Sequence, residues 1–166
     1  MSGFVLEDGP MTTWQQFTDD APDLASRVRA RFEATKHHVM ATLRKDGAPR
    51  VSGTEVAWYQ DDLVVGSMYQ ARKALDLQRD PRVAIHANPG DGSMEGGDAK
   101  LSARAVEVVD PAELANFVDS EQPPEPLHLF RLDLLEVVLT SLHPDGDRLV
   151  IETWRPGAGV KRVERR

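Results

Sequence analysis

Two adjacent cations, Arg72 and Lys73, open a short helical pattern that follows directly on a strand-like run ending at Ser67. The first turn of a helix presents unpaired backbone N–H groups and the positive end of the helix dipole, and both attract an anion. A guanidinium beside an ammonium strengthens this attraction, and the Ser67 hydroxyl can donate one more hydrogen bond. The pattern therefore predicts a phosphate site, and the alternative interpretation is a basic turn exposed to solvent.

Other residues that could do chemistry are few. The chain has no cysteine, which excludes disulfides, thiol nucleophiles, thiolate zinc sites and Cys-ligated iron–sulfur clusters. His37 and His38 are neighbours in a strand pattern, so their side chains point to opposite faces and do not converge on one metal ion. Ser93 lacks a Gly-x-Ser-x-Gly motif, because Asp91 stands two positions before it. We predict no metal site, leave the catalytic residues unknown, and expect any redox chemistry to depend on a bound organic cofactor or haem.

Length and charge limit the classes of function. A chain of 166 residues with 40% hydrophobic residues is sufficient for one domain with one core. Its formal net charge of −7 argues against nucleic-acid binding, which needs a clustered basic face. We find no apolar run near the roughly 20 residues of a membrane span, and no signal-peptide pattern at the start. These observations predict a cytoplasmic protein that contacts neither nucleic acid nor membrane.

The segment before the cations predicts a covering helix. Residues 1–18 carry scattered aromatic side chains (Phe4, Trp14 and Phe17) without periodicity, and we expect a loosely ordered lead-in. A helix capped by Asp19 or Asp20 is expected next, because apolar residues then recur at intervals of four. These residues are Leu24, Val28 and Phe32. The helix is therefore expected to lie with one face on an apolar surface.

Most of the remaining chain alternates like strands. The strand patterns cover residues 38–44, 49–59, 63–68, 83–87, 100–109, 129–142 and 148–154. Helical patterns cover residues 71–79 and 110–119, and an Asp-Gly pair at 46–47 is typical of a hairpin turn. The first three strands, joined by short turns, predict a meander. The expected fold class is mainly β, an antiparallel barrel of six to seven strands with about three short helices.

The order and spacing of several segments resembles the pyridoxamine 5'-phosphate oxidase-like split-barrel flavoprotein family. The segments are Ala41-Thr42-Leu43, Asp46-Gly47-Ala48-Pro49, Leu63-Val64-Val65-Gly66-Ser67, Arg72-Lys73, Leu77 and Asp80-Pro81-Arg82-Val83. They span about the first two-thirds of the chain, with a weaker match in the final strand pair. The resemblance implies one split-barrel flavin-binding domain over residues 1–166, with 156–166 as a C-terminal tail. It also implies a homodimer whose cofactor sites lie between the subunits.

The resemblance further implies a bound FMN or, as in a large branch of the family, the deazaflavin coenzyme F-420. It assigns the cofactor phosphate to Ser67, Arg72 and Lys73, with backbone contacts from Gly66 and Met68. It places Thr54, Glu55 and Val56 along the ring edge, and Trp154 as a contact from the partner chain. Glu55 would repel a phosphate, so we expect its side chain to point away or the strand register to differ. The longer anionic tail of the deazaflavin would need extra cations, for which Arg44, Lys45, Arg50 and Lys161 are candidates.

The function implied by the resemblance is that of a flavin-dependent oxidoreductase that transfers hydride to or from a small unsaturated substrate. Such chemistry belongs to the ring system, so the protein needs only to bind, orient and tune it. Pyridoxamine-phosphate oxidase activity itself is not expected, because the substrate-binding segments differ. The Arg-rich second strand is replaced by Gly53-Thr54-Glu55-Val56, and the terminal Arg-Leu-His-Asp-Arg segment has no counterpart in residues 160–165. The alternative is a non-catalytic protein that sequesters flavin or haem.

Overall fold

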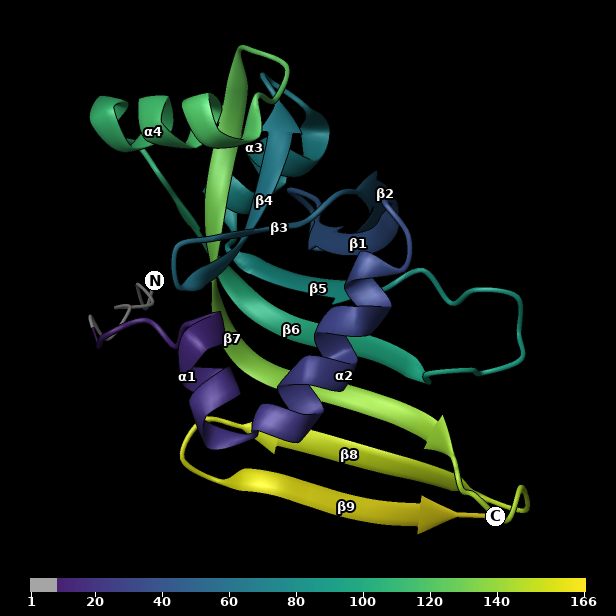
Figure 1. Cartoon of the computed structure of the whole chain (residues 1–166). Coiled ribbons are helices and arrows are strands. Elements are labelled where there is room, and N and C mark those ends of the chain that lie inside the picture. Colours follow the sequence, from purple (N-terminus) through teal and green to yellow (C-terminus); the bar gives the residue numbers. More distant parts are fainter. Residues whose placement is uncertain (1–8) are drawn as a thin grey trace.

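One antiparallel sheet organises the computed structural model, which describes residues 9–166 (Figure 1). Nine strands are found within these residues: β1 (His38–Leu43), β2 (Pro49–Thr54), β3 (Ala57–Tyr59), β4 (Asp62–Met68), β5 (Arg82–His86), β6 (Asp98–Glu107), β7 (Leu127–Leu142), β8 (Leu149–Arg155) and β9 (Gly159–Arg165). Four helices accompany them: α1 (Trp14–Asp20), α2 (Pro22–Glu33), α3 (Arg72–Arg79) and α4 (Pro111–Glu121).

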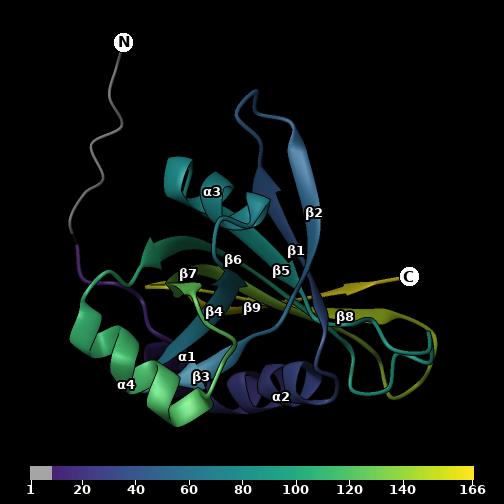
Figure 2. The same cartoon turned by 90° about the horizontal axis from the view of Figure 1, so that it is seen from above.

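The sheet is curled but not closed. Its strand order is β2-β1-β5-β6-β7-β4-β3, so β2 and β3 lie at opposite ends of the path although they are consecutive in the chain. Residues 55–56 cross from one edge of the sheet to the other, and β2 pairs with β1 while β3 pairs with β4. Viewed from above, α3 and α4 lie on opposite sides of β4 (Figure 2). This arrangement confirms the predicted antiparallel split barrel.

The strand count differs from the prediction at two places. The expected strand over 49–59 is broken, because its first part pairs with β1 as far as Thr54 and its last part pairs with β4 from Ala57. The expected meander of three strands is therefore interrupted, and the break follows Gly53, a residue that weakens a strand interior. The C-terminal tail contains β9, which pairs with β8 from Gly159 to Arg165. Both faces of β9 are largely exposed, so its sequence is mostly polar and did not indicate a strand.

The lead-in is also more ordered than expected within the described residues. Helix α1 begins at Trp14, and the Thr13 side chain caps it by accepting a hydrogen bond from the backbone N–H of Gln16 at 3.0 Å. Trp14 and Phe17 are buried in the core, which explains why this short helix is stable. Phe4, the other aromatic side chain of the lead-in, lies outside the described residues.

The main core lies between the sheet and the helices α1 and α2, which cover one face of it (Figure 1). Leu24, Val28 and Phe32 are all buried there, as their spacing predicted. Burial of a large apolar side chain contributes about 1.5–3 kcal/mol relative to exposure. Trp58 packs against this cluster from β3, with its ring 5.4 Å from that of Trp14. The helices thereby fix β3, and with it one edge of the open sheet.

A smaller cluster holds α4 beside β4. Phe117 of α4 packs edge-on against Tyr59 of β3, with ring centroids 5.2 Å apart. Two ion pairs strengthen this contact, because the Arg131 guanidinium on β7 contacts both Glu113 of α4 and Asp62 of β4. Helix α4 is thus fixed along the edge of the sheet opposite α3. No helix in the described part of the chain is long and apolar enough to span a membrane.

Candidate cofactor site

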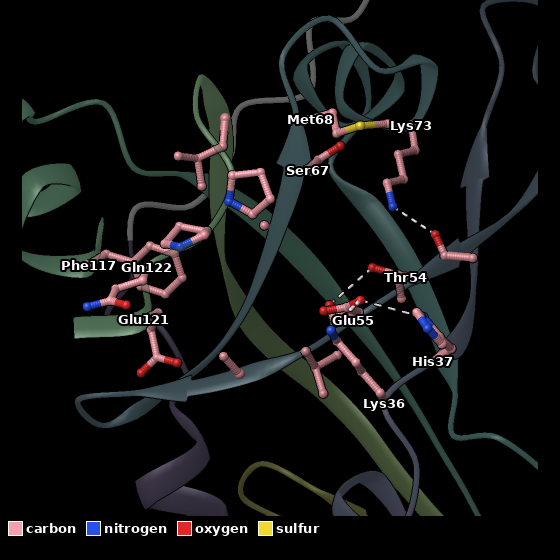
Figure 3. Close-up of a pocket in the computed structure, with 17 residues that line it drawn as sticks. Lys36, His37, Thr54, Glu55, Ser67, Met68, Lys73, Phe117, Glu121 and Gln122 are labelled. Carbon is pink, nitrogen blue, oxygen red and sulfur yellow. Dashed lines mark hydrogen bonds and ion pairs between the residues drawn. The ribbon is translucent and has the colours of Figure 1, made fainter. Parts of the chain in front are cut away.

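A cavity lies where the sheet fails to close. Its volume is about 540 Å³, within the range of roughly 300–1,000 Å³ typical of small-molecule sites. Residues from five parts of the chain line it (Figure 3): Lys36, His37, Gly53, Thr54, Glu55, Val56, Ala57, Gly66, Ser67, Met68, Lys73, Phe117, Glu121, Gln122, Pro123, Pro124 and Leu127. The opening between the two sheet edges is therefore a pocket with a polar end and apolar walls.

Helix α3 contributes the cation at the polar end. Its N-cap, Ala71, has no side-chain acceptor, so the first N–H groups of the helix have no capping partner. The Lys73 amine donates a 2.7 Å hydrogen bond to the Gly53 carbonyl oxygen of β2, which links α3 to the other side of the opening. Burial lowers the pKa of Lys73, and Glu55 opposes this effect. The structure thus places an ammonium at a helix N-terminus beside the pocket.

A buried carboxylate fixes the position of α3 against the sheet. Asp76, whose side chain is 4% exposed, accepts hydrogen bonds from Thr42 of β1 at 2.8 Å, Arg50 of β2 at 2.6 Å and Arg79 at 3.0 Å. Burial alone would raise the pKa of Asp76, but the hydrogen bonds from Arg50, Thr42 and Arg79 outweigh it and lower this pKa to about 2. Asp76 therefore joins α3 to β1 and β2 and holds the Lys73 side of the pocket in place.

Ser67 lines the same end of the pocket and has an unpaired hydroxyl. The residue is 6% exposed, and its Oγ is buried without a hydrogen-bond partner in the protein. A buried polar group left unpaired costs about 1–3 kcal/mol. An oxygen-rich ligand would remove that cost, because a phosphate oxygen can accept the hydroxyl proton. The donor set of Ser67, Lys73 and the α3 N-terminus fits the phosphate group of a flavin nucleotide.

Replacing Ser67 with alanine is expected to change stability and binding in opposite senses. The free energy of unfolding should stay the same or rise by up to about 1 kcal/mol, because the lost hydroxyl has no partner. Affinity for a phosphate-bearing flavin should fall roughly tenfold, because a hydrogen bond to a charged group is lost. Urea denaturation and a flavin fluorescence titration measure the two effects. A destabilised variant with unchanged flavin affinity would show that the hydroxyl serves the fold.

The opposite end of the pocket carries a second charged group. The Glu55 carboxylate lies 3.7 Å from the Lys36 amine and 3.6 Å from His37 Nδ1. Figure 3 shows this group on the far side of the pocket from Ser67 and Met68. Glu55 therefore faces Lys36 and His37, on the far side of the pocket from Ser67, and the expectation that its side chain points away from the phosphate end agrees with this geometry.

Comparison with known families bears directly on this site. Residues 24–141, which are 118 of the 166 residues, match a family model described as pyridoxamine 5'-phosphate oxidase. The chain belongs to the pyridoxamine 5'-phosphate oxidase family. No curated protein matches the sequence. The family assignment predicted from segment order is thus confirmed.

Solved structures similar to this family member share its fold at low sequence identity. A pyridoxamine 5'-phosphate oxidase-related, FMN-binding protein from Nostoc punctiforme has a TM-score of 0.63 and 12% identity, with 88% of this chain and 96% of that one covered. PhzG from Burkholderia lata, in complex with tetrahydrophenazine-1-carboxylic acid, has a TM-score of 0.57, 17% identity and 97% coverage of both chains. The heme storage protein HutZ from Vibrio cholerae has a TM-score of 0.51 and 21% identity, with 69% and 89% covered.

Seven of the nine residues assigned from the resemblance line the pocket of this family member. They are Gly66, Ser67, Met68, Lys73, Thr54, Glu55 and Val56. Arg72 is exposed at the outer side of the first turn of α3, outside the pocket lining. Trp154 is fully buried beneath α1, with its ring 4.7 Å from that of Phe17. Its side chain thus lies in the core of its own chain, and its expected contact with a partner's cofactor stays a prediction.

Sequence reasoning missed one wall of the pocket. The end of α4 and the connector after it contribute Phe117, Glu121, Gln122, Pro123 and Pro124. Residues 120–126 are mostly polar, which is typical of a connector, and the long-range packing of Phe117 on Tyr59 is what places α4 beside β4. The three prolines between residues 120 and 127 were the available signal, since proline stiffens a chain that must form a wall. Lys36 and His37 had no local signal for this site.

Proposed function

We propose that this family member is a homodimeric oxidoreductase that binds FMN in the pocket between β2 and β4. One observation carries the proposal: Ser67, whose buried hydroxyl has no hydrogen-bond partner, lines the same pocket as Lys73. Ser67, Lys73 and the N-terminus of α3 would hold the phosphate. Val56, Ala57 and Leu127 would line the space for the ring system. FMN would supply hydride transfer, and the chain would bind it, orient it and exclude water.

The position of the remaining cations favours FMN over the deazaflavin coenzyme. Arg50 is engaged by the buried Asp76 carboxylate. Arg44 and Lys45 belong to the turn between β1 and β2, and Lys161 lies on β9 at the end of the molecule away from β4 (Figure 1). None of these four lines the pocket. The longer anionic tail of the deazaflavin would therefore find no groove of cations leading from the pocket of one chain.

Haem sequestration is the alternative function. Similar folds include the heme storage protein from Vibrio cholerae and a heme binding protein from Mycobacterium smegmatis. Haem iron needs an axial ligand such as histidine, and His37 lines the pocket. Its side chain is 76% exposed and faces Glu55, so it lies at the mouth of the cavity. A flavin needs no such ligand and uses the Ser67 hydroxyl, and for this reason FMN is the proposal.

A titration of the cofactor-free protein decides between these cofactors. We expect FMN to bind with quenched flavin fluorescence, riboflavin to bind more weakly, and the deazaflavin to bind more weakly than FMN. A Soret band on addition of haem, with no change in flavin fluorescence, would overturn the proposal in favour of sequestration.

Reduction of bound FMN by a nicotinamide donor, followed by reoxidation with quinones and other unsaturated acceptors, tests the oxidoreductase activity. Light scattering of the purified protein tests the homodimer, and pyridoxamine phosphate is expected not to be oxidised.

A further inference from the structure

We propose that His128 is a positioning residue for the phosphate end of the pocket. The inference rests on the proposed function, because it assigns the side chain that holds Ser67 and the start of α3 in register with a phosphate. His128 lies on β7, is 8% exposed, and is the residue that pairs with Ser67 across the β4–β7 ladder. It does not line the pocket itself. Its effect on a ligand must therefore pass through the turn that it holds.

That turn joins β4 to α3 in three residues. Gln70 adopts the left-handed conformation, with φ of +61°, which is uncommon for a residue other than glycine. Two backbone bonds shape the turn: Tyr69 N–H donates to the Pro126 carbonyl oxygen at 3.2 Å, and Ala71 N–H donates to that of Met68 at 3.0 Å. The backbone N–H of Gln70 donates instead to His128 Nε2, at 3.2 Å. His128 thus accepts the backbone hydrogen bond of Gln70, the residue of the turn in the left-handed conformation.

The two ring nitrogens of His128 have different roles. Nε2 accepts the Gln70 N–H, so it carries a lone pair. Nδ1 lies 2.7 Å from Glu107 Oε1 and is therefore the nitrogen that donates. Both carboxylate oxygens of Glu107 also accept hydrogen bonds from the side-chain amide of Gln78 on α3, at 2.9 and 3.1 Å. The imidazole is thus held between the turn and a carboxylate that is itself bonded to α3.

Packing fixes the plane of the ring. The Tyr69 ring stacks on the imidazole with centroids 5.3 Å apart and planes 10° apart. Phe130, also on β7, lies 6.3 Å from the imidazole at an angle of 28°. The ring cannot turn without breaking these stacks, so its Nε2 lone pair stays directed at the Gln70 N–H. Lys73, which lines the pocket, follows Gln70 by three residues in the chain.

A matched pair of variants tests this role. Glutamine places its amide oxygen where Nε2 stands, whereas asparagine places its polar atoms nearer Nδ1, and both lose the aromatic ring. In His128→Asn we expect the Gln70 amide proton to exchange roughly fivefold faster in the cofactor-free protein, and the ratio of FMN to riboflavin affinity to fall by about the same factor. In His128→Gln we expect both quantities to stay within about twofold of the wild type.

Riboflavin lacks the phosphate, so this ratio separates the phosphate end from the ring pocket, and a general loss of stability would lower both affinities together. Equal Gln70 exchange in all three proteins would overturn the inference, as would an unchanged affinity ratio in His128→Asn when the wild type binds FMN. Faster exchange in His128→Asn alone, in a wild type that binds no FMN, would leave the role of His128 in the turn supported and would reject FMN binding instead.

Discussion

Replacing Lys73 with methionine is expected to weaken FMN binding by roughly 10- to 100-fold, because a charge-assisted hydrogen bond contributes about 1.5–3 kcal/mol. Methionine keeps most of the side-chain volume and removes the ammonium that lines the pocket. Riboflavin affinity should change by no more than about threefold, since riboflavin carries no phosphate. Fluorescence titrations of both flavins give the two constants. An equal loss for both would mean that the Lys73–Gly53 bond shapes the whole pocket.

Arg72→Met is the matched control for this experiment. The resemblance assigned Arg72 to the phosphate together with Lys73, whereas the structure leaves its side chain exposed outside the pocket lining. We expect Arg72→Met to weaken FMN binding by less than about fivefold, the range of an exposed charge. A loss as large as that of Lys73→Met would show that the guanidinium turns inward when the phosphate is present, as the resemblance implies.

Replacing Asp76 with asparagine is expected to lower the free energy of unfolding by about 2–3 kcal/mol at pH 7. The pKa of Asp76 falls from 3.8 to about 2 in the folded protein, and each pKa unit corresponds to about 1.4 kcal/mol. Because the folded pKa is the lower one, this stabilisation is complete above about pH 4 and is lost as the pH falls towards 2. Urea denaturation of both proteins from pH 7 to pH 2 measures the difference, which should shrink within that window.

Glu33→Gln provides the comparison for the Asp76 variant. Glu33 pairs with Arg29 on the surface of α2, with both side chains about half exposed, and such a pair contributes about 0.5 kcal/mol or less. Its removal should leave unfolding almost unchanged. If Asp76→Asn also lost less than about 1 kcal/mol at pH 7, the three hydrogen bonds to Asp76 would not be the anchor of α3. A difference that persisted undiminished at pH 2 would likewise contradict the cause given for the pKa.

The parts of the site that sequence predicts are those built from neighbouring residues. A strand ending at Met68 and a helix starting at Arg72 are local patterns, so the strand and helix at the polar end of the pocket could be predicted before the structure. The buried face of α2 was equally local, because Leu24, Val28 and Phe32 lie on successive turns. In each case the short run of residues that carries the pattern is also the segment whose structure the pattern predicts.

The parts that sequence did not predict depend on distant partners. Residues 49–59 form a continuous strand pattern, and only the pairing of Thr54 with β1 and of Ala57 with β4 divides it. Trp154 has the alternation of its strand, which puts it on the buried side with Val150, but no local feature showed that α1 would cover it. The Gln70 N–H and His128 are 58 residues apart. They are in contact because β7 lies beside β4, and no motif within either segment predicts this contact.

The crossing at residues 55–56 also limits how far the two edges of the open sheet can separate. Three peptide steps separate Thr54 from Ala57, and a fully extended chain advances at most about 3.6 Å per residue, so here the two edges stay within roughly 11 Å of each other. The 2.7 Å hydrogen bond from the Lys73 amine to the Gly53 carbonyl oxygen is a second link across the same opening. The opening of the pocket therefore cannot widen at this end while the covalent chain is intact.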